Sequence, residues 1–140
     1  MHNTRSLGLG FFAIFLMCGP VYADQMKFTA NLAPGPGITS SGKGAATASL
    51  DTATKTLTWT VEYSGLSGPA TAAHIHGPAD PGKDAGVVVP FTGNLASPIK
   101  GSATLTDAQI AQLEAGKWYV NIHTAANKGG EIRGQLVRAS

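Results

Sequence analysis

The chain has 140 residues, with ten Lys and Arg residues, eight Asp and Glu residues and a single cysteine. This length suits one small domain rather than several. The formal net charge is only +2 and no basic run occurs, so nucleic acid and anionic membrane surfaces are poor candidates for partners.

The first 23 residues have the order of a secretory signal. Arg5 precedes an apolar segment, Leu7 to Met17, and Ala23 offers a small residue at a cleavage point before Asp24. We therefore expect a periplasmic or secreted protein whose mature chain does not insert into a membrane. A lipoprotein signal ending at Cys18 is the alternative, although Met17 is large where such signals want a small residue. Cleavage would remove the only cysteine, and with it any disulfide.

The remaining 117 of the 140 residues read as short strands separated by turns. In Thr56 to Tyr63, for example, Leu57, Trp59 and Val61 alternate with polar residues and should face the core. The expected strands are 26–32, 44–50, 56–63, 70–76, 87–89, 117–124 and 131–137. Glycine- and proline-rich loops are expected at 33–37 and 78–86, and a further loop at 125–129.

One short helix is expected at about 106–115. Thr106 and Gln109 have the spacing of a capping box, Ile110 and Leu113 share a face, and Gly116 suits the C-terminal cap. About seven or eight strands with one helix indicate an all-β fold, an antiparallel Greek-key-like sandwich or barrel.

The histidines concentrate in two of the expected strands. Once the leader with His2 is removed, three remain: His74, His76 and His123. Side chains alternate along a strand, so His74 and His76 point to the same side, roughly 7 Å apart at Cα. Two imidazoles at that spacing can reach one metal ion.

Strand alternation also predicts which residues surround these histidines. With Ile75, Val120 and Ile122 directed at the core, the histidines face outward. In the last strand Glu131 and Arg133 share that outward face. If the three strands are neighbours, the histidines, Glu131 and Arg133 form one cluster.

The simpler interpretations are that a histidine on a surface is a solvated polar residue, and that Glu131 and Arg133 form an exposed salt bridge of about 0–1 kcal/mol. In the 78–86 loop, Asp80, Lys83 and Asp84 read as solubilising residues, and Trp59, Tyr63 and Trp118 as core.

Four segments together resemble the CHRD domain, a module named after chordin, an extracellular inhibitor of bone morphogenetic proteins. They are Ala73-His74-Ile75-His76-Gly77-Pro78-Ala79, Leu105-Thr106, Gly116-Lys117-Trp118-Tyr119-Val120-Asn121-Ile122-His123-Thr124 and Gly129-Gly130-Glu131-Ile132-Arg133-Gly134-Gln135-Leu136. The resemblance runs from about Gln25 to Val137. It implies a CHRD domain at 24–140 after a signal peptide at 1–23, and an extracytoplasmic β-sandwich.

The pattern is also similar, in architecture, to copper,zinc superoxide dismutases, which are barrels with a His-x-His strand and a later histidine. That resemblance implies His74, His76 and His123 as copper ligands and Arg133 as a guide for an anion. However, those enzymes use four histidines on copper and a disulfide, so a two-metal site is excluded here.

Two functions follow as hypotheses. The first is a mononuclear site in which three histidines bind copper, or alternatively zinc, for metal binding or for redox chemistry on a small oxygen species. The second is a non-catalytic module that binds an extracellular protein partner through the 78–86 and 125–130 loops.

Overall fold

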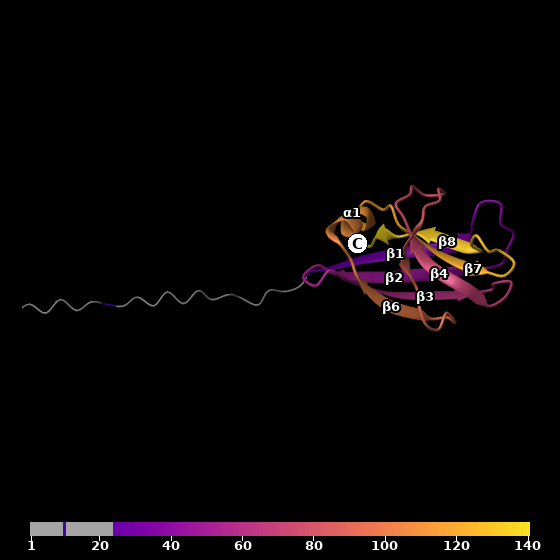
Figure 1. The fold of residues 1–140 in the computed structure, drawn as a ribbon, viewed down its shortest axis with the longest axis horizontal. Coiled ribbons are helices and arrows are strands. Elements are labelled where there is room, and N and C mark those ends of the chain that lie inside the picture. Colours follow the sequence, from indigo (N-terminus) through magenta and orange to yellow (C-terminus); the bar gives the residue numbers. More distant parts are fainter. Residues whose placement is uncertain (1–9, 11–23) are drawn as a thin grey trace, which may run out of the picture.

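The computed structural model describes Gly10 and residues 24–140, which form an antiparallel, nearly closed β-barrel with one short helix (Figure 1). The expected all-β sandwich or barrel with one helix is confirmed. The expected cleavage after Ala23 and the alternative lipid site at Cys18 lie outside the described residues.

Four strands, all antiparallel, make the first side of the barrel. They are β1 (Gln25–Pro34), β2 (Lys43–Asp51), β3 (Thr56–Ser64) and β6 (Ile99–Thr104), paired in the order β1-β2-β3-β6. Each strand turns small or apolar residues inward and polar ones outward. In β1, Phe28, Ala30 and Leu32 are buried while the residues between them are exposed.

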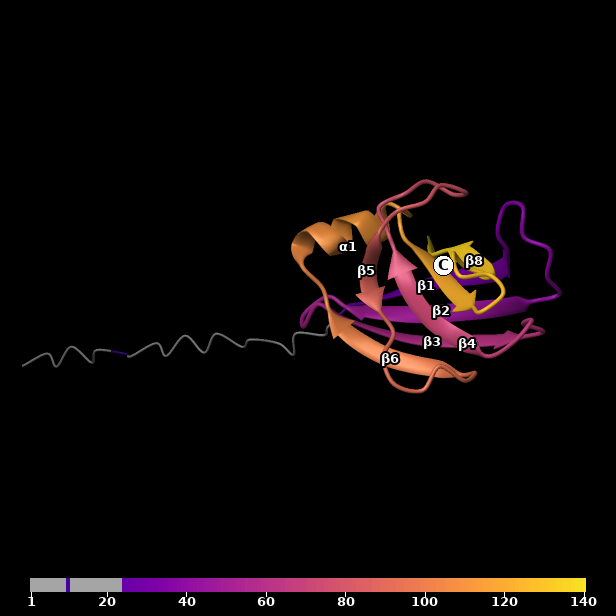
Figure 2. The ribbon, with the colours of Figure 1, turned by 45° about the vertical axis from the view of Figure 1, so that its right-hand side comes forward.

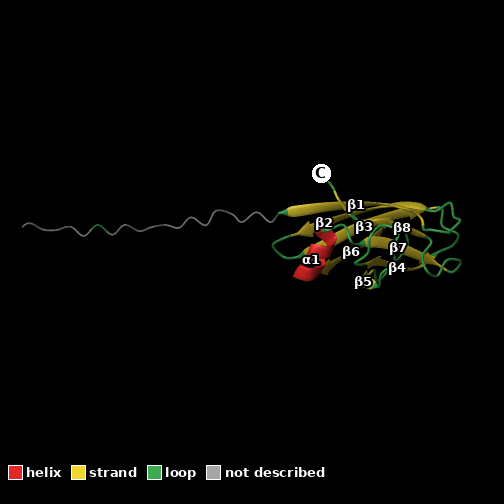
Figure 3. Ribbon diagram, turned by 90° about the horizontal axis from the view of Figure 1, so that it is seen from above, coloured by secondary structure: helices red, strands yellow, loops and turns green. Residues whose placement is uncertain are grey.

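Five further strands complete the barrel. They are β4 (Ala70–His76), β5 (Val87–Pro90), β7 (Tyr119–Thr124), β8 (Ile132–Gln135) and β9 (Val137–Arg138). The order β5-β4-β7-β8 continues into β1, because Ala33 and Pro34 pair with Arg133 and Ile132 of β8. Strands β4 and β7 run obliquely to β1, β2 and β3 (Figure 2), and seen from above β1 and β5 lie at opposite edges of the barrel (Figure 3).

The sequence reading missed β6. Its residues Ile99–Thr104 are mostly small or polar, and only Ile99 is fully buried. Gly101 explains the weak signal, because a Cβ there would lie 2.6 Å from Cζ2 of Trp59. At Gly101 the strand thus leaves room for the indole, and Ile99 is the fully buried side chain that it adds to the core.

Helix α1 (Asp107–Glu114) closes one end of the barrel (Figure 3). Its capping box is present: the Thr106 hydroxyl accepts from the Gln109 amide at 3.2 Å, and the Gln109 side chain accepts from the Thr106 amide at 2.9 Å. Leu113 is buried and Ile110 half-buried against the core. Trp59 and Trp118 are core residues as expected, 5% and 0% exposed, and Tyr63 is half-buried against the core.

Candidate metal centre

Strands β4, β7 and β8 lie side by side, which confirms the expected neighbourhood. Register places His74 opposite Asn121, and Asn121 opposite Arg133. In the next row, His76 lies opposite Tyr119. The predicted inward residues of these strands are buried in the core, so all five polar side chains share the outer face of the sheet.

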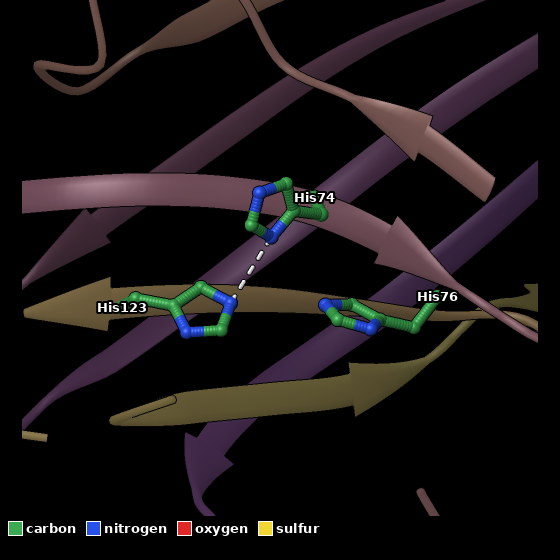
Figure 4. Close-up of side chains that lie close together, drawn as sticks. All are labelled: His74, His76 and His123. Carbon is green, nitrogen blue, oxygen red and sulfur yellow. Dashed lines mark hydrogen bonds between the residues drawn. The ribbon is translucent and has the colours of Figure 1, made fainter. Parts of the chain in front are cut away.

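The three histidines converge on this face (Figure 4). Their ring centroids are 4.9 Å apart for His74 and His123, 5.3 Å for His74 and His76, and 5.8 Å for His76 and His123. One ligand nitrogen from each ring lies within 4.8 Å of the others. Within the described residues this is the one group of three or more His, Cys, Asp or Glu side chains that could hold a metal ion.

Backbone carbonyls orient two of the rings. Nδ1 of His76 lies 2.9 Å from the Ala85 carbonyl oxygen, and Nδ1 of His123 lies 2.8 Å from that of Lys128. A carbonyl oxygen only accepts, so each Nδ1 carries the proton and each Nε2 is left with a free lone pair. A hydrogen bond on the far nitrogen is how proteins usually fix a metal-binding histidine.

The remaining histidine, His74, is hydrogen-bonded to His123. Nδ1 of His74 lies 3.1 Å from Nε2 of His123. Because Nε2 of His123 has the lone pair, His74 donates through Nδ1. A metal at the centre would replace this shared proton, with His74 shifting its proton to its own Nε2.

The donor set fits a transition-metal ion. Nε2 of His76 is buried and has no hydrogen-bond partner in the described part of the chain. Leaving such an acceptor unpaired is costly, and a metal bonded at about 2.0–2.1 Å would satisfy it. Nδ1 of His74 and Nε2 of His123 are already 3.1 Å apart. The three ligand nitrogens lie within 4.8 Å of one another, so the His76 ring would have to move closer to the other two to share one metal ion.

The site favours neutral imidazoles. Burial lowers the pKa of His74 below its ordinary 6.5, and the neighbouring His123 and His76 lower it further. Burial also lowers the pKa of His76, although the hydrogen bond that the ring donates to the Ala85 carbonyl acts in the opposite direction. Neutral imidazole is the form that binds a metal.

Arg133 lies on the expected face but has other partners than expected. Its two terminal nitrogens donate to Asp84 Oδ1 at 2.7 Å and to the Lys83 carbonyl at 2.6 Å. Its guanidinium also stacks over the Tyr119 ring, 3.8 Å from the ring centroid. The expected surface salt bridge between Arg133 and Glu131 is therefore wrong.

Glu131 was expected to point outward beside the histidines, and this is also wrong. Glu131 is fully buried. The carboxylate accepts hydrogen bonds from Ser40, Ser67, Thr124 and Asn127. Burial raises its pKa, but the bonds from the Ser67 side chain and amide, and from Thr124 and Ser40, outweigh this and bring the pKa of Glu131 to about 2. A carboxylate with so many donors needs no cation.

The loop at 78–86 is fastened to the sheet rather than free. Asp80 forms an ion pair with Lys117, and the Ala79 carbonyl accepts from Gln135 at 2.9 Å. Asp84 pairs with Arg133 as described above, so the acidic residues of this loop do more than solubilise it. Tyr119 was not among the residues expected to serve the site. Its place opposite His76 in the register was the available signal.

A cavity of about 260 Å³ opens on the Arg133 side of the sheet face. Asn121 and Arg133 line it, together with glycines of the loops at 35, 82, 129 and 130. Its volume is below the range of pockets for drug-sized ligands, so it would admit only a small molecule.

A family model described as the CHRD domain matches residues 28–136. The chain belongs to the CHRD family. No curated protein and no solved structure gives a significant match. CHRD domains are generally extracellular. Among the residues described, no helix is long and apolar enough to cross a membrane.

Three observations locate the centre within this CHRD domain. The His-x-His pair lies at the end of β4, the third histidine lies in β7, and the loops that follow each strand supply the carbonyls that orient the rings. The likeness to superoxide dismutases stays an analogy of architecture.

Proposed function

We propose that this CHRD domain is a periplasmic or secreted protein that binds one transition-metal ion through His74, His76 and His123. The observation that carries the proposal is the buried Nε2 of His76, which has no hydrogen-bond partner among the residues described and points toward Nε2 of His123 (Figure 4). Three imidazoles leave room for water or a small co-ligand on the metal.

Copper is the preferred metal and zinc the alternative. Imidazole suits both ions, and Cu(II) has the higher intrinsic affinity for nitrogen ligands among the divalent first-row metals. When bound, copper would supply one-electron chemistry and zinc a Lewis acid. The domain's own residues would fix the ligand tautomers and exclude bulk water from His76 and His123.

Redox chemistry on a small oxygen species is a finer proposal. It requires a co-reactant to approach the metal, and the cavity lined by Asn121 and Arg133 lies beside the histidines, because Asn121 is the register partner of His74. Arg133 would then attract an anion, with Asp84 offsetting part of its charge. With the copper site fully occupied, Arg133→Ala should slow a reaction with an anionic substrate and weaken the dependence of that rate on ionic strength.

Titration of the mature protein with Cu(II) and Zn(II), followed by calorimetry and by the Cu(II) paramagnetic resonance spectrum, tests the metal site. Each single substitution, His74→Ala, His76→Ala or His123→Ala, should weaken Cu(II) binding by at least about tenfold, which is about 1.4 kcal/mol. Thr58→Ala, an exposed change on β3, is the matched control and should bind like the wild type.

Binding that ignores the loss of His123 would sink the three-histidine site. The protein-binding hypothesis would then lead. Both loops that it invokes contact the histidine face through Ala85 and Lys128.

A further inference from the structure

Tyr119 lies between a metal-site ligand and a cation. Its ring is stacked on the His76 ring, with centroids 5.0 Å apart and planes 7° from parallel. Arg133 lies over the same ring with its guanidinium carbon 3.8 Å from the centroid. Tyr119 and His76 are direct register partners on β7 and β4, so the strands themselves set this stack.

The same three side chains hold one short loop segment, Lys83 to Ala85. Arg133 binds the Lys83 carbonyl and the Asp84 carboxylate. The Ala85 amide donates to the Tyr119 hydroxyl at 3.0 Å. The Ala85 carbonyl accepts from His76 Nδ1 at 2.9 Å and from the Tyr119 hydroxyl at 3.3 Å.

These contacts hold the Ala85 carbonyl in place. That carbonyl accepts from Nδ1 of His76 and so leaves Nε2 free to bind a metal. If Ala85 moved away, Nδ1 of His76 would lose its acceptor and the ring could take either tautomer. Tyr119 restrains both components, since its ring packs against the imidazole and its hydroxyl binds the Ala85 backbone. Arg133 fixes the two residues before Ala85 and covers the Tyr119 ring. Tyr119 is 2% exposed, so water competes little for these contacts.

We propose that Tyr119 and Arg133 are positioning residues that hold Ala85 and thereby keep His76 in its metal-binding tautomer. The expected effect on metal affinity rests on the proposed metal function, whereas the His76 tautomer is a property of the protein before any metal binds. Because coupling between sites is reciprocal, metal binding should in turn order the 83–85 segment.

The first test is on the metal-free protein. Long-range ¹H–¹⁵N spectra report the tautomer of each histidine ring. The wild type should show His76 protonated at Nδ1. Tyr119→Phe, which keeps the ring but loses the hydroxyl, should give a mixture of tautomers at His76. Arg133→Lys, which loses the planar stack and the two-point contact, should do the same. His123 should be unchanged in both.

The second test is Cu(II) affinity. Loss of a residue that orients a ligand typically weakens metal binding by about 10–100-fold. Tyr119→Phe and Arg133→Lys should each weaken Cu(II) binding by at least about tenfold, and Tyr119→Leu by more. The change in the Cu(II) resonance spectrum should be the same in the first two variants.

Gln135→Ala is the control. Gln135 holds the same loop at Ala79 and lies opposite Tyr119 on β8, but its side-chain hydrogen bonds within the described residues go to the Ala79 and Gly116 carbonyls and not to a histidine. It should leave both the His76 tautomer and Cu(II) affinity as in the wild type. An effect equal to that of Tyr119→Phe would show general loosening of the loop and overturn the proposal.

The two proposals fail separately. A wild type that binds no metal but has a fixed His76 tautomer, lost in Tyr119→Phe, would reject the metal function and keep the positioning role. A His76 tautomer that is indifferent to both substitutions would reject the positioning role, whatever the metal affinity.

Discussion

His74 and His76 are two residues apart yet are held differently. Nδ1 of His76 bonds to a backbone carbonyl, whereas Nδ1 of His74 is shared with His123. A metal would therefore meet Nε2 from His76 and His123 but Nδ1 from His74. His74 is also the most exposed of the three, so it is the ligand that can adjust when a metal enters.

The lowered pKa of His74 and of His76 sets the pH response of metal binding. Because each pKa is lowered, both rings stay neutral when the pH falls somewhat below 6.5, the ordinary pKa of histidine. Protons should therefore begin to compete with the metal only at a lower pH than they do for free imidazole. Cu(II) affinity measured from about pH 8 down to about pH 4.5 should be flat near neutrality and then fall. A steep fall between about pH 8 and pH 7 would contradict this prediction, because it would mean ligands that titrate near or above neutrality.

Glu131 should be a strong stability determinant. Glu131→Ala leaves several buried or half-buried donors without an acceptor and should lower the free energy of unfolding by about 3 kcal/mol. Its carboxyl has a pKa of about 2 against an ordinary 4.5, so its contribution is full above pH 4.5 and is lost as the pH falls toward 2. Denaturant unfolding at several pH values measures both effects.

The control for Glu131 is Glu114→Ala, an exposed change at the end of α1, which should leave stability nearly unchanged. A Glu131 variant as stable as the wild type at neutral pH would mean that the hydroxyl and amide donors find other partners.

At the scale of elements, local sequence rules worked where one face of a strand is polar and where a cap has a defined spacing. The alternation in β3 and β4 and the Thr106–Gln109 pair predicted their structures directly. Two failures have a common cause. Gly101 in β6 and the polar Glu131 beside β8 have roles set by residues distant in the chain, Trp59 and Ser67. Local periodicity carries no trace of such partners.

The capping box of α1 gives a prediction at this scale. Thr106→Ala removes the side-chain acceptor for the Gln109 amide and should cost about 1 kcal/mol of stability. Thr92→Ala, at an exposed loop threonine, serves as the comparison. Equal unfolding midpoints for the two variants would show that this cap does not stabilise the helix.

At the scale of the whole molecule, the sequence predicted that the three histidines would share a face, because the side-chain period of a strand is fixed. It could not predict the carbonyls of Ala85 and Lys128 that orient the rings, since these come from loops whose paths depend on tertiary contacts. The partners of Arg133 were unpredictable for the same reason: Asp84 and Lys83 lie about 50 residues earlier in the chain.

The leader gives a prediction for the whole chain. Export should cleave the protein between Ala23 and Asp24, because the charged, apolar and small-residue segments occur in the order a signal peptidase recognises. Intact mass of the exported protein measures the cut. A lipid-bearing N-terminus at Cys18 would instead mark the leader as a lipoprotein signal.

Strand β7 is buried along both of its faces, from Tyr119 to Thr124. One face fills the barrel and the other carries His123 and the stack on His76, whereas β1 buries only alternate residues. We therefore expect amino-acid substitutions to be tolerated unequally in the two strands. Substitutions should be tolerated more readily at the exposed alternate positions of β1 than in β7, where each residue packs in the core, lies on the histidine face or, as Thr124 does, binds Glu131. Under the proposed metal function, the six residues of β7 form the segment in which stability and metal binding have to evolve together.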